Sequence, residues 1–113
     1  MEIYKKAYGD TPHESIATGM GNLAGVLQEL EKYDEAKQLF RQALEMRKKV
    51  HGDEHPMVAL ALANLARLLQ ERDPDSAEAA RLGKQALAIA EKTLGPDHPR
   101  TQRFRERFGE LSE

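Results

Sequence analysis

The side chains with the clearest chemical potential are two histidines beside two carboxylates. His51, Asp53, Glu54 and His55 stand close together, and imidazole and carboxylate groups are ligands for zinc and other transition metals. His98 occupies a corresponding segment without a second histidine. Both His55 and His98 precede a proline, which is common at the first position of a helix. A helix start is therefore favoured over a metal site, and we expect neither a metal nor another cofactor.

The remaining sequence lacks the patterns that catalysis requires. The chain has no cysteine to act as a nucleophile. It also lacks a serine in a nucleophile-elbow context and a glycine-rich phosphate loop after a strand. Gly19 and Gly21 lie in a segment with helical periodicity, where the backbone amides are already hydrogen-bonded. The abundant glutamates and lysines are typical of solvated helix faces. We expect the protein not to be an enzyme.

Two asparagines and two arginines are better suited to binding than to catalysis. Asn22-Leu23-Ala24 recurs as Asn64-Leu65-Ala66, and a side-chain amide can donate to and accept from the backbone of an extended peptide. Arg103 and Arg107 stand one helical turn apart, a spacing that suits an anionic ligand. The alternative interpretation of the asparagines is that both face solvent and are shared only through repeat ancestry.

An internal repeat determines where these residues lie. Gly9-Asp10, Gly52-Asp53 and Gly95-Pro96 follow one another at a period of 43 residues. Gln42-Ala43-Leu44 recurs in the same way as Gln85-Ala86-Leu87. A period of this length indicates stacked structural units, each too small to bury its hydrophobic face alone.

Each unit is predicted to form two amphipathic helices. Apolar residues recur at steps of three and four, which is typical of a helix with one buried face. Thr11-Pro12 and Asp73-Pro74 each offer an N-cap residue followed by proline, a signal for a helix start. With boundaries good to about 2–4 residues, we expect helices near residues 2–8, 13–30, 34–51, 56–72, 74–94 and 99–112.

The two ends of the chain extend the repeat pattern. Residues 1–10 align without a gap on residues 44–53, which predicts the second helix of a truncated preceding repeat. Phe104 and Phe108 share one face of the last helix, and charged residues cover the other, as in a helix that caps a stack. The predicted organisation is the end of a repeat over 1–10, repeats over 11–52 and 53–95, and a C-terminal capping helix over 96–113.

Composition agrees with this organisation. The 113 residues are 40% hydrophobic and 32% charged, with a formal net charge of −2, and residues that favour helices are abundant. The small negative charge provides no overall attraction for nucleic acid or for an anionic membrane. The apolar segments are too short for a membrane span or an export signal. We therefore expect no nucleic-acid partner, no membrane partner and a cytoplasmic location, which the absence of cysteine also suits.

Small residues stand where the two helices of each unit are expected to cross, at Ala24, Ala36 and Ala43 and again at Ala66, Ala79 and Ala86. Together with the turn over residues 31–36 and the loop over 94–99, they resemble the tetratricopeptide repeat, in the longer-period variety of kinesin light chains and bacterial arrays. HEAT-type repeats have a similar length without these small residues. The resemblance implies an all-α fold of antiparallel helix-turn-helix repeats stacked as a right-handed α-solenoid.

Glycines depart from the pattern in two places. Gly19, Gly21 and Gly25 lie inside the first unit's leading helix, where each costs up to about 1 kcal/mol relative to alanine. Close helix approach, or room for a ligand, would offset that cost. Gly83 stands where the first unit has Phe40, so we expect the groove to be reshaped there.

The resemblance implies a protein-binding scaffold whose leading helices line a concave groove. Asn64, Arg103 and Arg107 resemble part of a carboxylate clamp, but Gly21 and Gly25 replace its first-repeat residues, so a full clamp is absent. We expect a protein or peptide partner. The alternative is a structural fragment of a larger array, or a homo-oligomer formed through exposed repeat ends. Projecting the groove face gives the candidate binding residues Asn22, Gln28, Asn64, Arg67, Gln70, Arg103 and Arg107.

Overall fold

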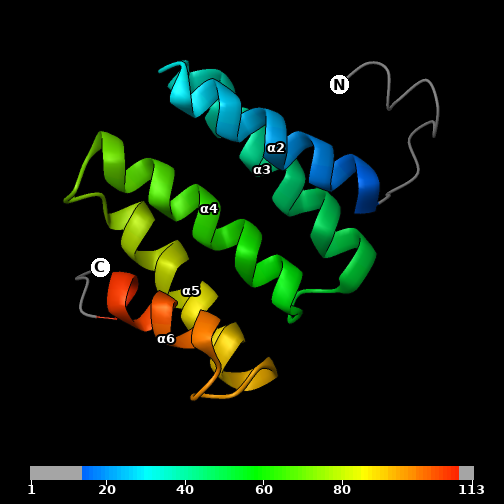
Figure 1. The fold of residues 1–113 in the computed structure, drawn as a ribbon, viewed down its shortest axis with the longest axis vertical. Helices are drawn as coiled ribbons and strands as arrows, with labels where there is room; N and C mark the ends of the chain where they lie inside the picture. Colours follow the sequence, from blue (N-terminus) through cyan, green and yellow to red (C-terminus); the bar gives the residue numbers. More distant parts are fainter. Residues whose placement is uncertain (1–13, 110–113) are drawn as a thin grey trace.

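A computed structural model describes residues 14–109, and all regular structure in that range is α-helical (Figure 1). The all-α prediction is therefore confirmed for this range. The helix predicted near residues 2–8, the Thr11 cap and the end of the last predicted helix lie outside the described residues. The helices are α2 (Glu14–Glu29), α3 (Tyr33–His51), α4 (Pro56–Arg72), α5 (Ala77–Thr93) and α6 (Pro99–Phe108).

The two His-Pro pairs begin helices, as their sequence predicts. The Nδ1 atom of His55 accepts a hydrogen bond from the backbone N–H of Met57 at 3.0 Å. The Nδ1 atom of His98 does the same for the N–H of Arg100, also at 3.0 Å. Each histidine thus satisfies one of the backbone donors that a helix leaves unpaired at its start.

The N-cap predicted at Asp73-Pro74 for the fourth described helix is wrong, although the helix begins within about 2–4 residues of the predicted start. Helix α5 begins at Ala77, and the Ser76 hydroxyl caps it by accepting from the N–H of Ala79 at 3.1 Å. The Asp73 carboxylate instead accepts from the N–H of Asp75 at 3.0 Å. This local bond closes a turn, because aspartate side chains readily bond the backbone two residues ahead. The turn uses the residues that the sequence pattern assigned to the helix cap.

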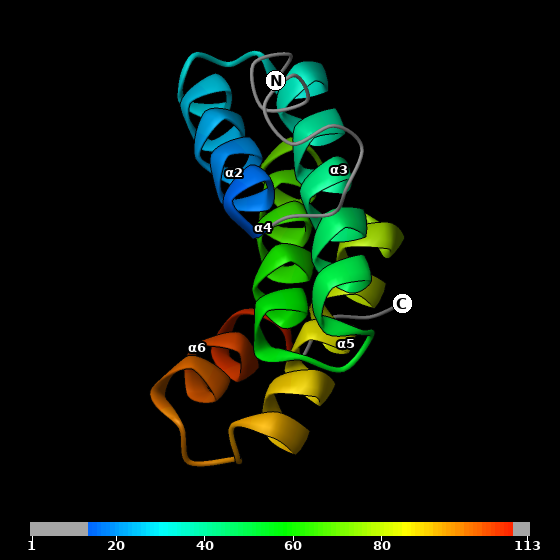
Figure 2. The same ribbon diagram turned by 90° about the vertical axis from the view of Figure 1, so that its right-hand side faces the viewer.

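The helices stack in chain order as hairpins, with α2 on α3, α3 on α4, α4 on α5 and α5 on α6. Figure 2 shows α2 and α6 projecting beyond α4 on one side, while α3 and α5 lie on the other side. The leading helices α2, α4 and α6 therefore form a concave face with α4 at its centre. The right-handed sense of the solenoid stays a prediction.

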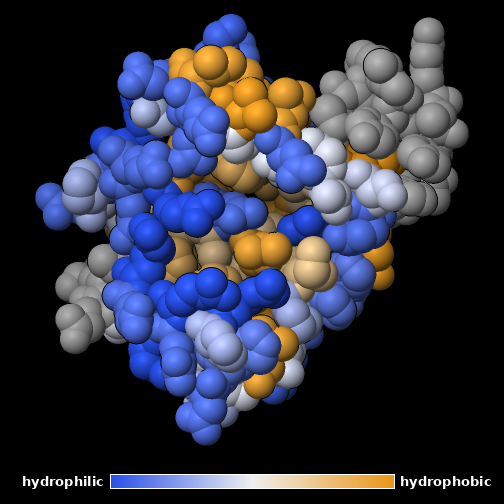
Figure 3. All heavy atoms as spheres, in the orientation of Figure 1, coloured by the Kyte–Doolittle hydropathy of each residue, from blue (hydrophilic) through white to orange (hydrophobic). Residues whose placement is uncertain are grey.

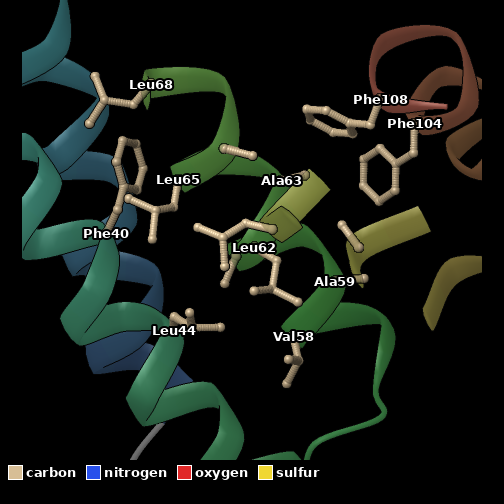
Figure 4. Close-up of a cluster of buried hydrophobic side chains, with 14 of the residues drawn as sticks. Phe40, Leu44, Val58, Ala59, Leu62, Ala63, Leu65, Leu68, Phe104 and Phe108 are labelled. Atoms are coloured by element: carbon tan, nitrogen blue, oxygen red, sulfur yellow. The ribbon is translucent and has the colours of Figure 1, made fainter. Parts of the chain in front are cut away.

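Alanines fill the helix crossings, as predicted from the sequence. Ala24, Ala36, Ala66 and Ala86 have no exposed surface, and Ala79 and Ala43 are 1% and 3% exposed. A side chain of one carbon lets neighbouring helices approach closely without a void. Around these crossings, larger side chains form a continuous hydrophobic cluster that extends from Phe40 on α3 to Phe108 on α6 (Figure 4).

The two interfaces between units are packed in opposite ways. Phe40 of α3 is buried in the cluster that holds Leu65 of α4 (Figure 4). One period later, the equivalent positions are Gly83 of α5 and Phe108 of α6. Phe108 is fully buried, and a Cβ atom on Gly83 would lie 2.3 Å from its Cδ1 atom. Gly83 therefore accommodates a ring from the facing helix, so the change at this position reshapes the core interface between α5 and α6.

The outer surface of α2 is partly apolar. Leu23 is 39% exposed, whereas its equivalent after the second asparagine, Leu65, is 2% exposed because α3 packs near it. Val26 and Leu30, at 51% and 62% exposure, continue the same strip. A strip with this spacing is the kind of surface that usually packs against another helix.

The outer surface of α6 is polar. Positions that carry buried Ala59 and Leu62 in α4 carry exposed Gln102 and Arg105 in α6. The buried face of α6 is formed by Thr101, Phe104 and Phe108, which pack towards α5. A polar outer face is what a capping helix requires, and the two ends of the described stack therefore differ in character.

Candidate peptide-binding groove

A groove of about 740 Å³ lies between α4 and α6 on the concave face. Figure 3 shows this face, with strongly hydrophilic atoms bordering a hollow that has apolar atoms at its floor. Five of the seven candidate residues line this one groove, and they come from two helices. They are Asn64, Arg67 and Gln70 from α4, and Arg103 and Arg107 from α6.

A smaller cleft of about 130 Å³ lies between α2 and α4. Asn22 and Asn64 both border it, so Asn64 lies at the junction of the cleft and the larger groove. Gly21 borders the cleft too, and a Cβ atom on Gly21 or Gly25 would meet nothing within 4 Å. Close helix approach therefore does not explain these two glycines.

Gln28 lies apart from the other candidate residues. It lines neither the groove nor the cleft. Its Nε2 atom donates to the Glu71 carboxylate at 2.7 Å, which links the end of α2 to the end of α4. At the same end, the Arg72 guanidinium lies over the ring of Tyr33 at 4.4 Å. The structure thus gives Gln28 a bridging role between helices.

Sequence reasoning missed several groove residues. Arg100 lines the groove together with Arg103 and Arg107; the steps of three and four between them would have placed all three on one helix face. The other missed residues form most of the apolar floor and contribute one carboxylate. They are Leu60, Ala63, Phe104, Phe108 and Glu106.

The groove carries cations that have no carboxylate partner in the described part of the chain. Arg67, Arg100, Arg103 and Arg107 form no ion pair with any residue from 14 to 109. Arginines elsewhere do, as when Arg105 reaches Glu91 at 3.1 Å. Of the residues that the structure describes, Glu106 is the one carboxylate in the groove lining. The groove therefore has a local excess of positive charge in a chain whose formal net charge is −2.

A buried acceptor also lies in the groove. The Oε1 atom of Gln70 is buried and has no hydrogen-bond donor within the described part of the chain. A buried polar atom without a partner is costly in a folded protein.

The histidine cluster is part of the packing between units. His51 Nε2 lies 2.6 Å from a carboxylate oxygen of Glu14, and its ring stacks on His55 with centroids 4.0 Å apart. The other oxygen of Glu14 lies 3.3 Å from Nε of buried Arg47, as an ion pair without an aligned hydrogen bond. Within residues 14–109, no three or more metal-ligating side chains are grouped in a way that could hold an ion.

Comparisons with known proteins identify the repeat. The family model described as tetratricopeptide repeat matches residues 15–92. The protein named clustered mitochondria protein homolog from Aspergillus niger is 32% identical over 102 residues, which cover 90% of this chain and 8% of that protein. The protein of the same name from Meyerozyma guilliermondii is 35% identical over 65 residues, or 52% of this chain and 5% of that protein.

This chain is thus similar to a small part of much longer proteins. It spans less than a tenth of the length of the two relatives described above. None of the helices within residues 14–109 is long and apolar enough to cross a membrane. From the family match over residues 15–92, the buried alanines at the crossings and the stacked helical hairpins, the chain belongs to the tetratricopeptide repeat family.

Proposed function

We propose that the protein is a non-catalytic module that binds a segment of a partner protein along the concave face of α2, α4 and α6. The observation that carries this proposal is the groove between α4 and α6. It combines an apolar floor with side chains that lack partners of their own in the described chain. Tetratricopeptide repeats generally mediate interactions between proteins, which supports the same conclusion. We propose a cytoplasmic location on the basis of composition.

The mechanism of binding rests on side chains that are positioned in advance. The groove residues project from helices held by a continuous core, so their relative positions change little when a ligand arrives. An extended peptide therefore bears most of the loss of conformational freedom. Asn22 and Asn64 are suited to hydrogen-bond its backbone, because an amide can both donate and accept.

Replacing Asn64 with alanine is expected to weaken binding by about 0.5–1.5 kcal/mol, the net value of one hydrogen bond. Asn64 borders both the groove and the cleft, so the loss should affect every peptide that crosses this junction, whatever its charge. Peptides selected on the wild-type protein from a random ten-residue library provide the ligands, and calorimetry provides the affinities.

The matched control is Gln85→Ala. Gln85 is an exposed amide on α5 and lies outside the groove and cleft linings. Its replacement should leave the affinities unchanged. Equal affinities of the wild-type and Asn64→Ala proteins for all selected peptides would show that they bind elsewhere, and the proposed groove would be abandoned.

A second candidate function is self-association, which the exposed strip formed by Leu23 and Val26 of α2 and by Leu30 just after it favours. Two copies pairing through this strip would bury it on both sides. Light scattering should then show a concentration-dependent dimer, and Val26→Lys should return the protein to a monomer. A wild-type protein that remains monomeric at about 100 μM, where weak micromolar pairs would form, excludes this candidate.

A further inference from the structure

We propose that the α6 end of the groove selects an acidic segment of the partner, with about three carboxylates clustered at one end of the bound peptide. This inference rests on the proposed function, because it assigns a ligand chemistry to the same groove. The four groove arginines, Arg67, Arg100, Arg103 and Arg107, carry it.

Charge counting determines how many carboxylates the ligand needs. Four guanidinium groups and the carboxylate of Glu106 give the described lining of the groove a formal charge of +3. Guanidinium groups bind carboxylates through paired, charge-assisted hydrogen bonds. Because these arginines form no ion pairs among the described residues, a ligand does not have to displace a partner within residues 14–109. Three carboxylates would neutralise the excess charge.

The neighbouring cleft has a different charge balance, which gives the ligand a direction. Arg47 lines that cleft, but the Glu14 carboxylate lies 3.3 Å from its Nε atom and balances its charge. The other polar residues that border the cleft, Thr18, Asn22 and Asn64, are uncharged. The acidic end of the ligand should therefore lie between α4 and α6, and an uncharged portion should pass Asn64 towards α2.

The floor of the groove adds a requirement beyond charge. Leu60, Ala63 and Phe104 provide apolar surface among the arginines. An apolar side chain next to the carboxylates would cover this surface and exclude water from the ion pairs, which strengthens them. The expected ligand is thus an acidic segment that contains an apolar residue, as opposed to a uniformly charged polymer.

The test compares three peptides of one sequence on the full chain. The first carries three glutamates beside a leucine, the second carries glutamines in their place, and the third carries one phosphoserine in place of the three glutamates. We expect the glutamate peptide to bind at least about 10-fold more tightly than the glutamine peptide, which corresponds to about 1.4 kcal/mol. Raising the salt concentration from 50 to 500 mM should remove most of this difference, because exposed charges are screened.

Arginine variants test whether the preference for the glutamate peptide arises in the groove. Arg103→Gln and Arg100→Gln should each reduce the preference for glutamate over glutamine several-fold, whereas Arg81→Gln should not. Arg81 is an exposed arginine on α5 that is absent from the groove lining. Its replacement by glutamine therefore removes the same charge as the groove variants do, but outside the groove. Thermal unfolding should be nearly the same for all three variants. The groove arginines have no ion pairs to lose within residues 14–109, and Arg81 loses only an exposed pair with Glu78 at 4.0 Å, which contributes little to stability.

Each outcome is decisive. Equal affinity for the glutamate and glutamine peptides, with sensitivity to Asn64→Ala, would overturn the acidic ligand while leaving the groove as a binding site. A preference for the phosphoserine peptide would overturn the carboxylate assignment. Binding of a single-stranded RNA oligonucleotide in preference to all three peptides would overturn both proposals. Failure of every probe to bind would overturn the acidic ligand as stated, and selection from the random library would then decide the groove separately.

Discussion

Replacing Gly83 with alanine is expected to destabilise the protein by about 1–3 kcal/mol, the usual cost of overpacking a core. Alanine is the better helix former by about 0.5–1 kcal/mol, so helix propensity alone would predict a gain in stability. The new Cβ atom would lie 2.3 Å from Cδ1 and 3.0 Å from Cβ of Phe108. Because Phe108 is fully buried in the α5–α6 interface, its ring cannot move aside without disturbing its neighbours. Urea unfolding measures the change.

The matched controls are Gly21→Ala and Gly25→Ala in α2. Both glycines are inside a helix, and a Cβ atom at either would meet nothing within 4 Å. These variants should be more stable than the wild type by about 0.5–1 kcal/mol. If all three glycine variants were stabilised alike, the close contact between Gly83 and Phe108 would be refuted.

Exchanging the two residue types extends this test. The first interface pairs Phe40 with Leu65, and the equivalent pair in the second is Gly83 with Phe108. Gly83→Phe alone should be severely destabilising, because two rings would compete for one space. Gly83→Phe combined with Phe108→Leu reproduces the first pair and should recover much of the stability. A double-mutant cycle should give a coupling of roughly 1–3 kcal/mol, and additive effects would argue against equivalent interfaces.

Replacing Ala66 with leucine should also cost about 1–3 kcal/mol through overpacking. Ala66 has no exposed surface and lies in α4, which packs against both α3 and α5. A side chain three carbons larger would push α4 away from its neighbours. Ala43→Leu should have a smaller effect than the sequence alone suggests, because Ala43 borders the cleft between α2 and α4. Thermal and urea unfolding together measure both changes.

Ala88→Leu is the control for side-chain size. Ala88 lies on the same kind of helix but is exposed on α5. Its replacement should change stability by less than about 0.5 kcal/mol, as for most surface substitutions. A similar loss in Ala66→Leu and Ala88→Leu would mean that the predicted helix crossings are not where the structure has them.

Most of the fold could be predicted because its determinants are local or periodic. The 43-residue period, the apolar steps and the His-Pro pairs each act within one helix or one loop, and the alanines repeat with the units. The start of α5 could not be predicted, because Asp73 and Ser76 are both suitable N-cap residues. The hydrogen bond from the N–H of Asp75 to the Asp73 carboxylate forms a turn, which leaves Ser76 as the cap. The role of Gly83 also required the structure, because its partner lies on another helix.

The groove was predictable to a similar degree. Helical periodicity placed Asn64, Arg67 and Arg107 on a shared face, and the structure gives them a common groove. Gln28 was assigned by the same periodicity, yet it lies near the end of α2 where Glu71 is within reach. The pairing of the arginines required the structure as well, because the sequence does not tell which of them lack a carboxylate neighbour within residues 14–109.

The two interfaces place the bulky ring on opposite partners, Phe40 on α3 in the first and Phe108 on α6 in the second. This difference helps to specify the order in which the units pack. Repeats that resemble one another can dock on the wrong neighbour during folding, and such misassembly is a characteristic failure of repeat proteins. If α6 docked on α3, Phe108 would meet Phe40. If a helix with leucine at the equivalent position, such as Leu65 of α4, took the place of α6 on α5, the space over Gly83 would stay unfilled. Each helix therefore fits one site well and the other poorly. An array assembled from such units resists register slippage without any difference in its helix lengths or loops.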